Sequence, residues 1–322
     1  MLAMTHNIKI GDYRIMAVDS VHVRKSVESL ADTATIVLPG TYINKAIDIE
    51  SKLKAGDKVL IKYGYDGYVE NEFKGWLNTI STDDASVTLE CEDDLYLFRK
   101  QLKNKQLLNI SAKALLQYIV KEIDQSFNIS CDYDFKYDKF IIMNLTGWDV
   151  LKKLQDETKA NIYFSNGTLH MHAQYSEITN IQPVIYDFAK NIEKSNLKYK
   201  GKDQRKYFIE IEGISSGGKK VSVTTGNPGG DKRSLKIYGV TDKASLLKKA
   251  NEELTTLVYD GFEGDFTGWL QPYCEPSYKV ILRDSEYPAK TGMYYVISVE
   301  TKFSSSGGER QITIGKKLRD ER

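Results

Sequence analysis

The 322-residue chain has little proline, cysteine or histidine, with six, three and four residues respectively, and its apolar runs are short. Cys91, Cys131 and Cys274 are odd in number and widely spaced, which argues against a disulfide framework or a zinc knuckle and favours buried free thiols. Apolar runs such as residues 59–61 and 140–143 have the length of strands, far below the ~20 residues that span a bilayer. We therefore predict that this chain does not insert into a membrane.

An excess of either charge is also missing. Lys and Arg number 45 against 44 Asp and Glu, so there is no global basic field to attract nucleic acid or a membrane surface. A basic stretch at residues 198–202 could line a passage for DNA, but nearby acidic residues favour a solvated surface of mixed charge. The first ten residues lack the basic start and apolar stretch of a secretory signal, which predicts synthesis in the cytoplasm.

Tyrosine is abundant, with 21 residues, and aromatic side chains favour pleated, half-buried surfaces. A chain of this length suits two to four modules. Residues 1–103 contain short strand-like runs separated by turn residues such as 56–57 and 64–67, a spacing typical of a small barrel or sandwich. We predict a first β-barrel over residues 1–103.

Helical periodicity begins after this β-rich part. Ser111 can cap a helix that runs to about residue 126, and Thr146, followed by Asp149 as an imperfect capping box, can begin a second helix that ends near Lys159. Asn166-Gly167 is a strong signal for a hairpin turn between two strand-like pieces. Residues 104–178 therefore form a compact α/β module.

Strand patterns return from Val184 onward. One helical stretch interrupts them, with Asp242 or Thr241 as its cap and Gly261 as its stop. We predict a second β-barrel over residues 179–234 and 266–322, with a helical insert at 235–265. The predicted fold class is α+β, mainly β, with two related small β-barrels, an intervening α/β module and a helical insert in the second barrel.

The two β-rich parts echo each other. Residues 75–81 run from Gly75 to an Ile-Ser pair, and residues 292–298 run from Gly292 to an Ile-Ser pair with identical spacing. Each glycine is expected at a bulge or tight bend. Chance similarity between two generic strand-turn-strand units is the alternative. If the parts are copies, a closed ring of three chains would display six quasi-equivalent faces.

Candidate chemistry is sparse. His170 and His172 alternate along a strand and could offer two imidazoles to a metal, but no Cys or third His lies nearby, and an ordinary half-exposed sheet face is the preferred interpretation. An acidic cluster could bind calcium or supply a glycosidase acid and base, but a solvated strand end is the preferred interpretation; its members are Glu90, Glu92, Asp93 and Asp94. We predict no catalytic, cofactor-binding or metal-binding residues, and no enzyme activity.

Large aromatic side chains dominate binding hot spots, so the three tryptophans are candidate structural or interface anchors. They are Trp76, Trp148 and Trp269. Trp148 lies at the start of the second helix, and we assign it to the core.

Several short sequence segments resemble those of a known family. They are residues 56–59 (Gly-Asp-Lys-Val), 73–76 (Phe-Lys-Gly-Trp), 89–93 (Leu-Glu-Cys-Glu-Asp), 148–151 (Trp-Asp-Val-Leu) and 167–169 (Gly-Thr-Leu). Together with the order of modules, they resemble the baseplate hub proteins of contractile phage tails, such as the late-control tail protein of Mu-like phages, and the related hubs of type VI secretion spikes.

The resemblance implies a homotrimeric ring in the virion tail baseplate that caps the tail tube, holds the central spike protein and surrounds a channel with DNA only as cargo. It offers no catalytic residues. Two other functions remain open: a tail-associated cell-wall hydrolase with its catalytic module in the α/β segment, and a surface carbohydrate-binding module whose tyrosines stack on sugars.

Overall fold

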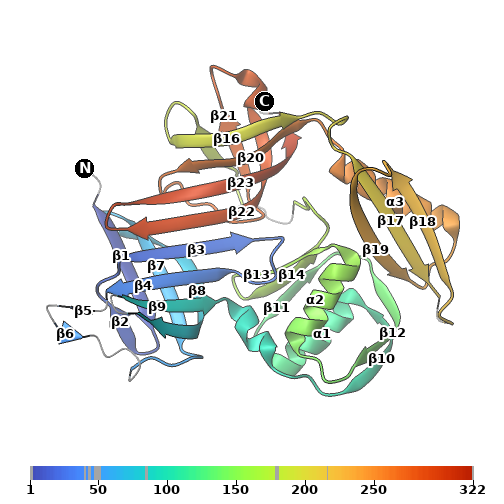
Figure 1. The fold of residues 1–322 in the computed structure, drawn as a ribbon, viewed down its shortest axis with the longest axis horizontal. Coiled ribbons are helices and arrows are strands. Elements are labelled where there is room, and N and C mark those ends of the chain that lie inside the picture. Colours follow the sequence, from blue (N-terminus) through green and yellow to red (C-terminus); the bar gives the residue numbers. More distant parts are fainter. Residues whose placement is uncertain are drawn as a thin grey trace. The chain divides into compact units, whose positions relative to one another are not determined.

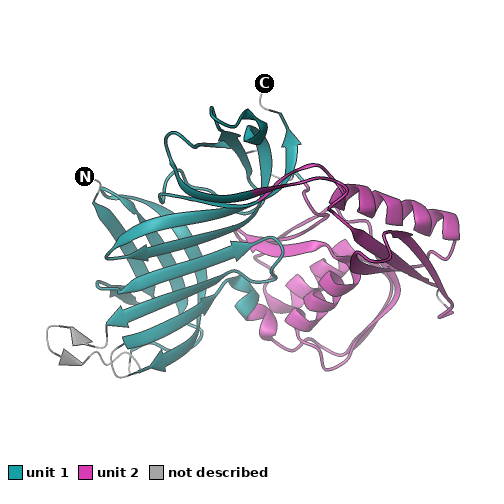
Figure 2. Cartoon of the chain, turned by 45° about the horizontal axis from the view of Figure 1, so that its top comes forward, with its two compact units in different colours: residues 1–96, 177–197, 264–322 teal, residues 97–176, 198–263 magenta. Residues whose placement is uncertain are grey.

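The computed structural model describes residues 3–39, 41–42, 45–46, 52–83, 86–177, 181–215 and 217–320. It contains two compact units, coloured separately in Figure 2. Unit 1 comprises residues 1–96, 177–197 and 264–322, and unit 2 comprises residues 97–176 and 198–263. Each unit is therefore assembled from segments that are distant in the sequence.

Unit 1 is built mainly from strands. In its N-terminal part these are β1 (Met4–Ile10), β2 (Tyr13–Ile15), β3 (Ser20–Ser26), β4 (Thr33–Pro39), β5 (Thr41–Tyr42), β6 (Lys45–Ala46), β7 (Lys58–Tyr65), β8 (Tyr68–Thr82) and β9 (Ser86–Glu92), followed by the 3-10 helix η1 (Asp94–Arg99). The later strands are β15 (Val184–Asp187), β16 (Ile192–Lys200), β20 (Gly261–Gly268), β21 (Lys279–Arg283), β22 (Gly292–Ser304) and β23 (Gly307–Arg319), with the 3-10 helix η2 (Pro288–Lys290).

Most of these strands form one connected sheet, in the order β16-β20-β23-β22-β3-β4-β9-β8-β7-β1-β2. Figure 1 shows β22, β3, β4 and β9 side by side, so the late β-rich part continues directly into the early one. The predicted class, α+β and mainly β, is confirmed. Two separate barrels are not confirmed, since the described strands form one network in which no closed ring is found.

Strand alternation places the core of unit 1. In β4, Ala34, Ile36 and Leu38 are buried while the residues between them are partly exposed. The same period of two sends Ile8 and Ile61 inward on neighbouring strands, because successive side chains of a strand point to opposite faces. These residues belong to one apolar cluster, which Leu270 and Phe303 of the late β-rich part also join.

The sequence echo corresponds to two antiparallel meanders, β7-β8-β9 and β21-β22-β23. In the first, the pairing register shifts between Leu77 and Thr79, just after Gly75. In the second, it shifts at the same distance after Gly292. A Cβ on Gly75 would lie 2.2 Å from the carbonyl oxygen of Glu92, so only glycine allows the two strands to approach here. The structure thus places a bulge close to each glycine.

Unit 2 contains all three α-helices of the described residues, α1 (Ala112–Ile123), α2 (Gly147–Thr158) and α3 (Lys243–Leu257). Its strands are β10 (Lys105–Ser111), β11 (Asn128–Cys131), β12 (Lys136–Ile142), β13 (Asn161–Ser165), β14 (Thr168–His172), β17 (Tyr207–Ile214), β18 (Lys220–Gly226) and β19 (Asp231–Tyr238).

The predicted helix starts are confirmed. The Ser111 hydroxyl accepts from the N–H of Ala114, and Thr146 with Asp149 forms a complete capping box. The first two helices contribute their apolar faces to the core of this unit, beside the sheet β11-β14-β13. Asn166 and Gly167 both have positive φ in the predicted hairpin turn between β13 and β14.

The helical insert carries a sheet of its own. β17 pairs with β18 and β19, and Ile209 and Ile211 of β17 pack with Leu246 and Ala250 of α3. We expected residues 198–234 in the second β-barrel, whereas the structure groups them with α3 in unit 2. The physical reason is that the apolar face of α3 is buried by these strands, and alternation alone does not identify the partner of a strand face.

None of the helices within the described ranges has the length and hydropathy that a bilayer span requires.

Candidate functional site

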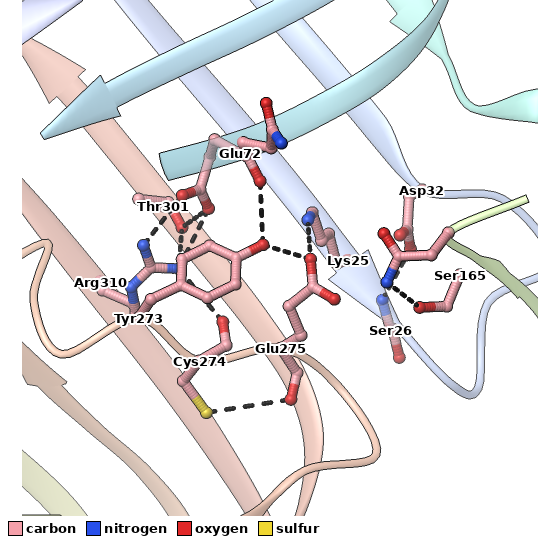
Figure 3. A network of polar contacts seen from close by, with 12 residues as sticks. Lys25, Ser26, Asp32, Glu72, Ser165, Tyr273, Cys274, Glu275, Thr301 and Arg310 are labelled. Carbon is pink, nitrogen blue, oxygen red and sulfur yellow. Dashed lines mark hydrogen bonds and ion pairs between the residues drawn. The ribbon is translucent and has the colours of Figure 1, made fainter. Parts of the chain in front are cut away.

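Unit 1 contains a buried ion pair between Glu72 and Arg310, drawn in Figure 3. Their side chains are 1% and 2% exposed. Arg310 donates from Nη1 to Oε1 of Glu72 at 3.0 Å and from Nη2 to Oε2 at 2.8 Å. Thr301 of β22 adds its hydroxyl, which donates to Oε1 at 2.8 Å. Such bidentate, charge-assisted geometry is the strong form of a hydrogen bond between an arginine and a carboxylate.

A β-bulge explains why a glutamate points into the core. Ile61 of β7 pairs with Phe73 and Lys62 pairs with Asn71, so Glu72 is the extra residue of β8. A bulge re-aims the side chain of its extra residue. The carboxylate of Glu72 consequently enters the interior, where the strand register alone would not place it.

Two further donors of Arg310 have backbone partners. Its Nε donates to the carbonyl of Leu270 at 3.1 Å, and Nη1 lies 3.2 Å from the carbonyl of Cys274. Burial alone would raise the pKa of Glu72, but the guanidinium of Arg310 and the ammonium of Lys25 bring this pKa below its ordinary value. Glu72 is therefore an anion, and Arg310 stays a cation, inside the protein.

A second buried pair lies beside the first. Nζ of Lys25, on β3, is 2.7 Å from Oε1 of Glu275, and the Tyr273 hydroxyl donates to the same carboxylate. The ring of Tyr273 lies over Arg310, with Cζ 4.9 Å from the ring centroid. Burial lowers the pKa of Lys25, but the carboxylates of Glu275, Glu72 and Asp32 together outweigh this effect and raise the pKa overall. The two pairs are together electrically neutral.

Two aspartates extend this network. The Asp93 carboxylate accepts from the N–H of Asp32 at 3.0 Å and from the N–H of Leu95 at 2.9 Å, while Asp32 accepts from the N–H of Ser26 at 3.0 Å. Burial raises the pKa of Asp32 to about 7, although Lys25 opposes this rise. Burial and the neighbouring Asp32 also raise the pKa of Asp93. Asp32 therefore titrates close to neutral pH.

We call this set the buried polar network; its members are Lys25, Asp32, Glu72, Asp93, Tyr273, Glu275, Thr301 and Arg310. It links β3 and β8 of the early β-rich part to β22, β23 and the segment before β21. Its two ion pairs are matched in charge and hydrogen-bonded, which is the arrangement that a stable interior requires. The network therefore serves to hold the two β-rich parts of unit 1 in one arrangement.

Two of the tryptophans lie against charged or polar neighbours. Trp76 on β8 is half-buried, and its indole N–H donates to Asp94 at 3.2 Å. Trp148 is also half-buried, with Cζ of Arg99 at 4.7 Å from its ring centroid. We assigned Trp148 to the core, but the buried face of α2 is formed by Val150 and residues further along, and Trp148 lies at the edge of this face.

Trp269 follows β20 and is 46% exposed. Burying so large an apolar surface in a partner contact would be favourable, because aromatic side chains carry a large hydrophobic contribution. Of the three candidates, it offers the most accessible ring.

The acidic cluster differs from the expected solvated strand end. Glu92, Asp93 and Asp94 are buried, and only Glu90 is exposed. The reason is local: Asp93 accepts two backbone N–H groups, and Asp94 accepts the indole of Trp76 while beginning η1. Within the described residues, no group of three or more His, Cys, Asp or Glu side chains is arranged to hold a metal ion.

The basic stretch beside β16 is paired with acidic residues, as a mixed-charge surface predicts. Lys202 lies 3.5 Å from Asp260, and Lys200 forms an ion pair with Glu263. Both pairs belong to unit 2.

His170 and His172 share one face of β14, as predicted, with Nδ1 of His170 3.4 Å from Nε2 of His172. Sequence reasoning missed their neighbours. Ser130 and Asp132 come from β11 and the residue after it, and both contact His172. Because β11 pairs with β14 in parallel across about forty residues of chain, only the strand register brings these side chains together.

The arrangement of the described elements is that of phage tail proteins. No protein-family model matches the chain, and no curated protein matches it by sequence. The similarity is one of structure, and it extends over nearly all of the chain.

The 43 kDa tail protein of prophage MuSo2 from Shewanella oneidensis has a TM-score of 0.67 and 16% identity, with 98% of each chain covered. A tail protein from Neisseria meningitidis MC58 has a TM-score of 0.67 and 12% identity, over 98% of this chain and 97% of that one. The E. coli c3393 protein, a component of the type VI secretion system, has a TM-score of 0.64 and 10% identity, over 98% of this chain and 78% of that one. This chain therefore has the tail-protein fold, as the resemblance implied.

Proposed function

We propose that the chain is a structural baseplate hub of a phage-like contractile tail, and that three copies form a ring adapting the sixfold tail tube to a threefold spike. The observation that carries this proposal is the full-length similarity in fold to two tail proteins and to a type VI secretion component. Because the similarity covers both units, it concerns the whole chain and not one widespread module.

The internal echo supplies the geometric argument. The meanders β7-β8-β9 and β21-β22-β23 have a glycine and a nearby bulge at matching positions. Three chains in a ring would present each meander three times, giving six related surfaces toward a sixfold tube. A chain that carries such a pair of related surfaces can match both symmetries.

The proposed mechanism is mechanical and requires no catalysis. A hub transmits load between the tube and the spike, so its two β-rich parts must keep a fixed arrangement. The buried polar network suits this requirement. Its bidentate Glu72–Arg310 pair fixes the relative orientation of the two side chains as well as the distance between them. The proposed partners are the tail tube protein and the central spike protein, with DNA only as cargo, and the proposed location is the virion tail after synthesis in the bacterial cytoplasm.

Assembly is the direct test. The full chain would be studied at micromolar concentration by mass photometry and negative-stain electron microscopy, alone and after co-expression with the neighbouring tube and spike proteins. We expect a trimer with a visible ring. A protein that stays monomeric in both settings would exclude the proposed ring, whereas a trimer that appears only with the partners would indicate assembly on the tube.

A further inference from the structure

The sheet β11-β14-β13 of unit 2 has a polar face that carries the two histidines of β14. Ser130 of β11 lies opposite His170 of β14, and Asn161 of β13 lies opposite His172. On the other face, Leu169 and Met171 are fully buried. The polar side chains are therefore mounted on strands that are held rigidly from behind, which is the support that a precise constellation needs.

His172 lies between a carboxylate and a hydroxyl. Its Nδ1 is 2.6 Å from Oδ1 of Asp132, and its Nε2 is 3.2 Å from Oγ of Ser130. An ionised carboxylate can only accept, so Nδ1 carries the proton and Nε2 presents its lone pair to the Ser130 hydroxyl. His172 is 4% exposed and Ser130 is half-buried. This order of groups is that of a nucleophile, its general base and the group that orients the base.

The neighbouring imidazole contacts the same nitrogen, with Nδ1 of His170 3.4 Å from Nε2 of His172, but adds no charge there. His170 stacks on Tyr163 with a centroid separation of 4.9 Å. Burial, with a smaller contribution from His172, lowers the pKa of His170 to about 4, so this ring is neutral at pH 7. The lone pair of His172 is therefore not opposed by a second fixed cation.

We propose that Ser130, His172 and Asp132 form a nucleophilic triad that reacts with small carboxylic esters. As Oγ of Ser130 bonds to the carbonyl carbon, its proton passes to Nε2 of His172. The ester C–O bond then breaks, and His172 returns the proton to the leaving alkoxide. Water attacks the resulting acyl group while giving a proton to His172, and Ser130 is released as its hydroxyl.

A fluorophosphonate probe tests this proposal on the full chain. Oγ of Ser130 forms a bond to phosphorus, the P–F bond breaks, fluoride leaves, and the hydroxyl proton passes to His172. We expect mass spectrometry to map the adduct to Ser130, and Ser130→Ala to remove it. His172→Gln should slow labelling by about 10²–10⁴-fold, the range that a general base contributes. Asp132→Asn should slow it as well and change its pH profile, as expected of a positioning residue.

The matched control is Ser126→Ala, in the turn before β11, where the backbone N–H bonds to Asp124. It should label at the wild-type rate, and each variant must keep the wild-type circular dichroism spectrum and unfolding midpoint. Absence of an adduct on Ser130 in the wild-type chain would overturn the triad even if every variant misfolds, as would wild-type labelling of folded His172→Gln. Ser130→Ala should leave ring assembly unchanged, so this proposal and the hub proposal fail separately.

Discussion

Glu72 and Arg310 are 238 residues apart in the chain and form a bidentate pair inside unit 1. Substituting Glu72→Gln leaves the guanidinium buried beside a neutral amide. Breaking a buried pair in this way typically costs about 3–5 kcal/mol, because the remaining charge is uncompensated. We expect the free energy of unfolding to fall by an amount of this order. Urea denaturation, followed by a spectroscopic signal from unit 1, would measure the change.

The matched control is Glu309→Gln, which removes the same kind of charge from an exposed pair. Glu309 lies 3.4 Å from Lys302, and the two side chains are 39% and 51% exposed. Exposed pairs contribute about 0–1 kcal/mol, so this variant should unfold almost as the wild type does. Equal losses in both variants would contradict a special role for the buried pair.

Asp32 makes stability depend on pH in a specific direction. Burial raises its pKa from 3.8 to about 7 in the folded protein, with Lys25, Glu275 and Asp93 as the charged neighbours. Between these values the folded chain holds a proton that the unfolded chain has released. The contribution of Asp32 to the free energy of unfolding therefore falls as pH rises from about 4 to about 7.

Asp32→Asn tests this linkage, because the amide oxygen can still accept from Ser26 but cannot titrate. In urea unfolding at several pH values between about 5 and about 8, the free energy of unfolding of the wild type should fall relative to that of the variant as pH rises. Parallel curves for the two proteins would mean that Asp32 is already ionised in the folded state throughout this range.

Residue-level roles could be predicted from the sequence only where they depend on near neighbours. The caps at Ser111 and Thr146 were predictable because each depends on a residue three positions away. The burial of Glu72 was not, since it follows from one extra residue in a long antiparallel pair. The contacts of Ser130 and Asp132 with His172 were not predictable either. They depend on the parallel register of β11 and β14, which the local sequence does not determine.

At the scale of elements, the start of α2 rests on its cap. The Thr146 hydroxyl accepts the N–H of Asp149 at 3.1 Å, and the Asp149 carboxylate accepts the N–H of Thr146 at 2.8 Å. Thr146→Ala should lower the free energy of unfolding by about 1 kcal/mol, the usual effect of losing an N-cap. Thermal unfolding followed by circular dichroism would measure it.

Thr255→Ala provides the comparison on α3. The Thr255 hydroxyl donates back to the carbonyl of Asn251 within the helix at 2.8 Å, and alanine has the higher helix propensity. This variant should be neutral or slightly stabilising. If both substitutions destabilise equally, the loss at Thr146 reflects general packing of threonine and not capping.

The sequence was more informative about elements than about their partners. The strand β17 was evident from alternation, and α3 from its apolar stripe and the Asp242 cap. The alternation of apolar and polar residues does not indicate which sheet packs against the apolar face of which helix. The association of β17 with α3, separate from β22 and β23, depends on tertiary packing between Ile209, Ile211 and the helix.

At the scale of the whole molecule, the fold is far better preserved than the sequence. Identities of 10–16% accompany TM-scores of 0.64–0.67 over nearly the whole chain. Burial at alternating positions can be maintained by many apolar residues, so the sheet persists while its side chains change.

If the chain works as a ring, its copies must bury apolar surface against one another or against tail partners. Trp269 is the candidate anchor, since it is 46% exposed and follows the sheet strand β20. Trp269→Ala should then weaken assembly by at least about 2 kcal/mol, which corresponds to roughly a thirtyfold rise in the dissociation constant. Mass photometry across a dilution series, with and without the tube and spike proteins, would measure this change.

Tyr287→Ala removes another aromatic side chain, which is 62% exposed in the same unit, and should leave assembly unchanged if the effect belongs to Trp269 itself. An unchanged dissociation constant for Trp269→Ala would remove this residue from the interface and leave the ring to other surfaces.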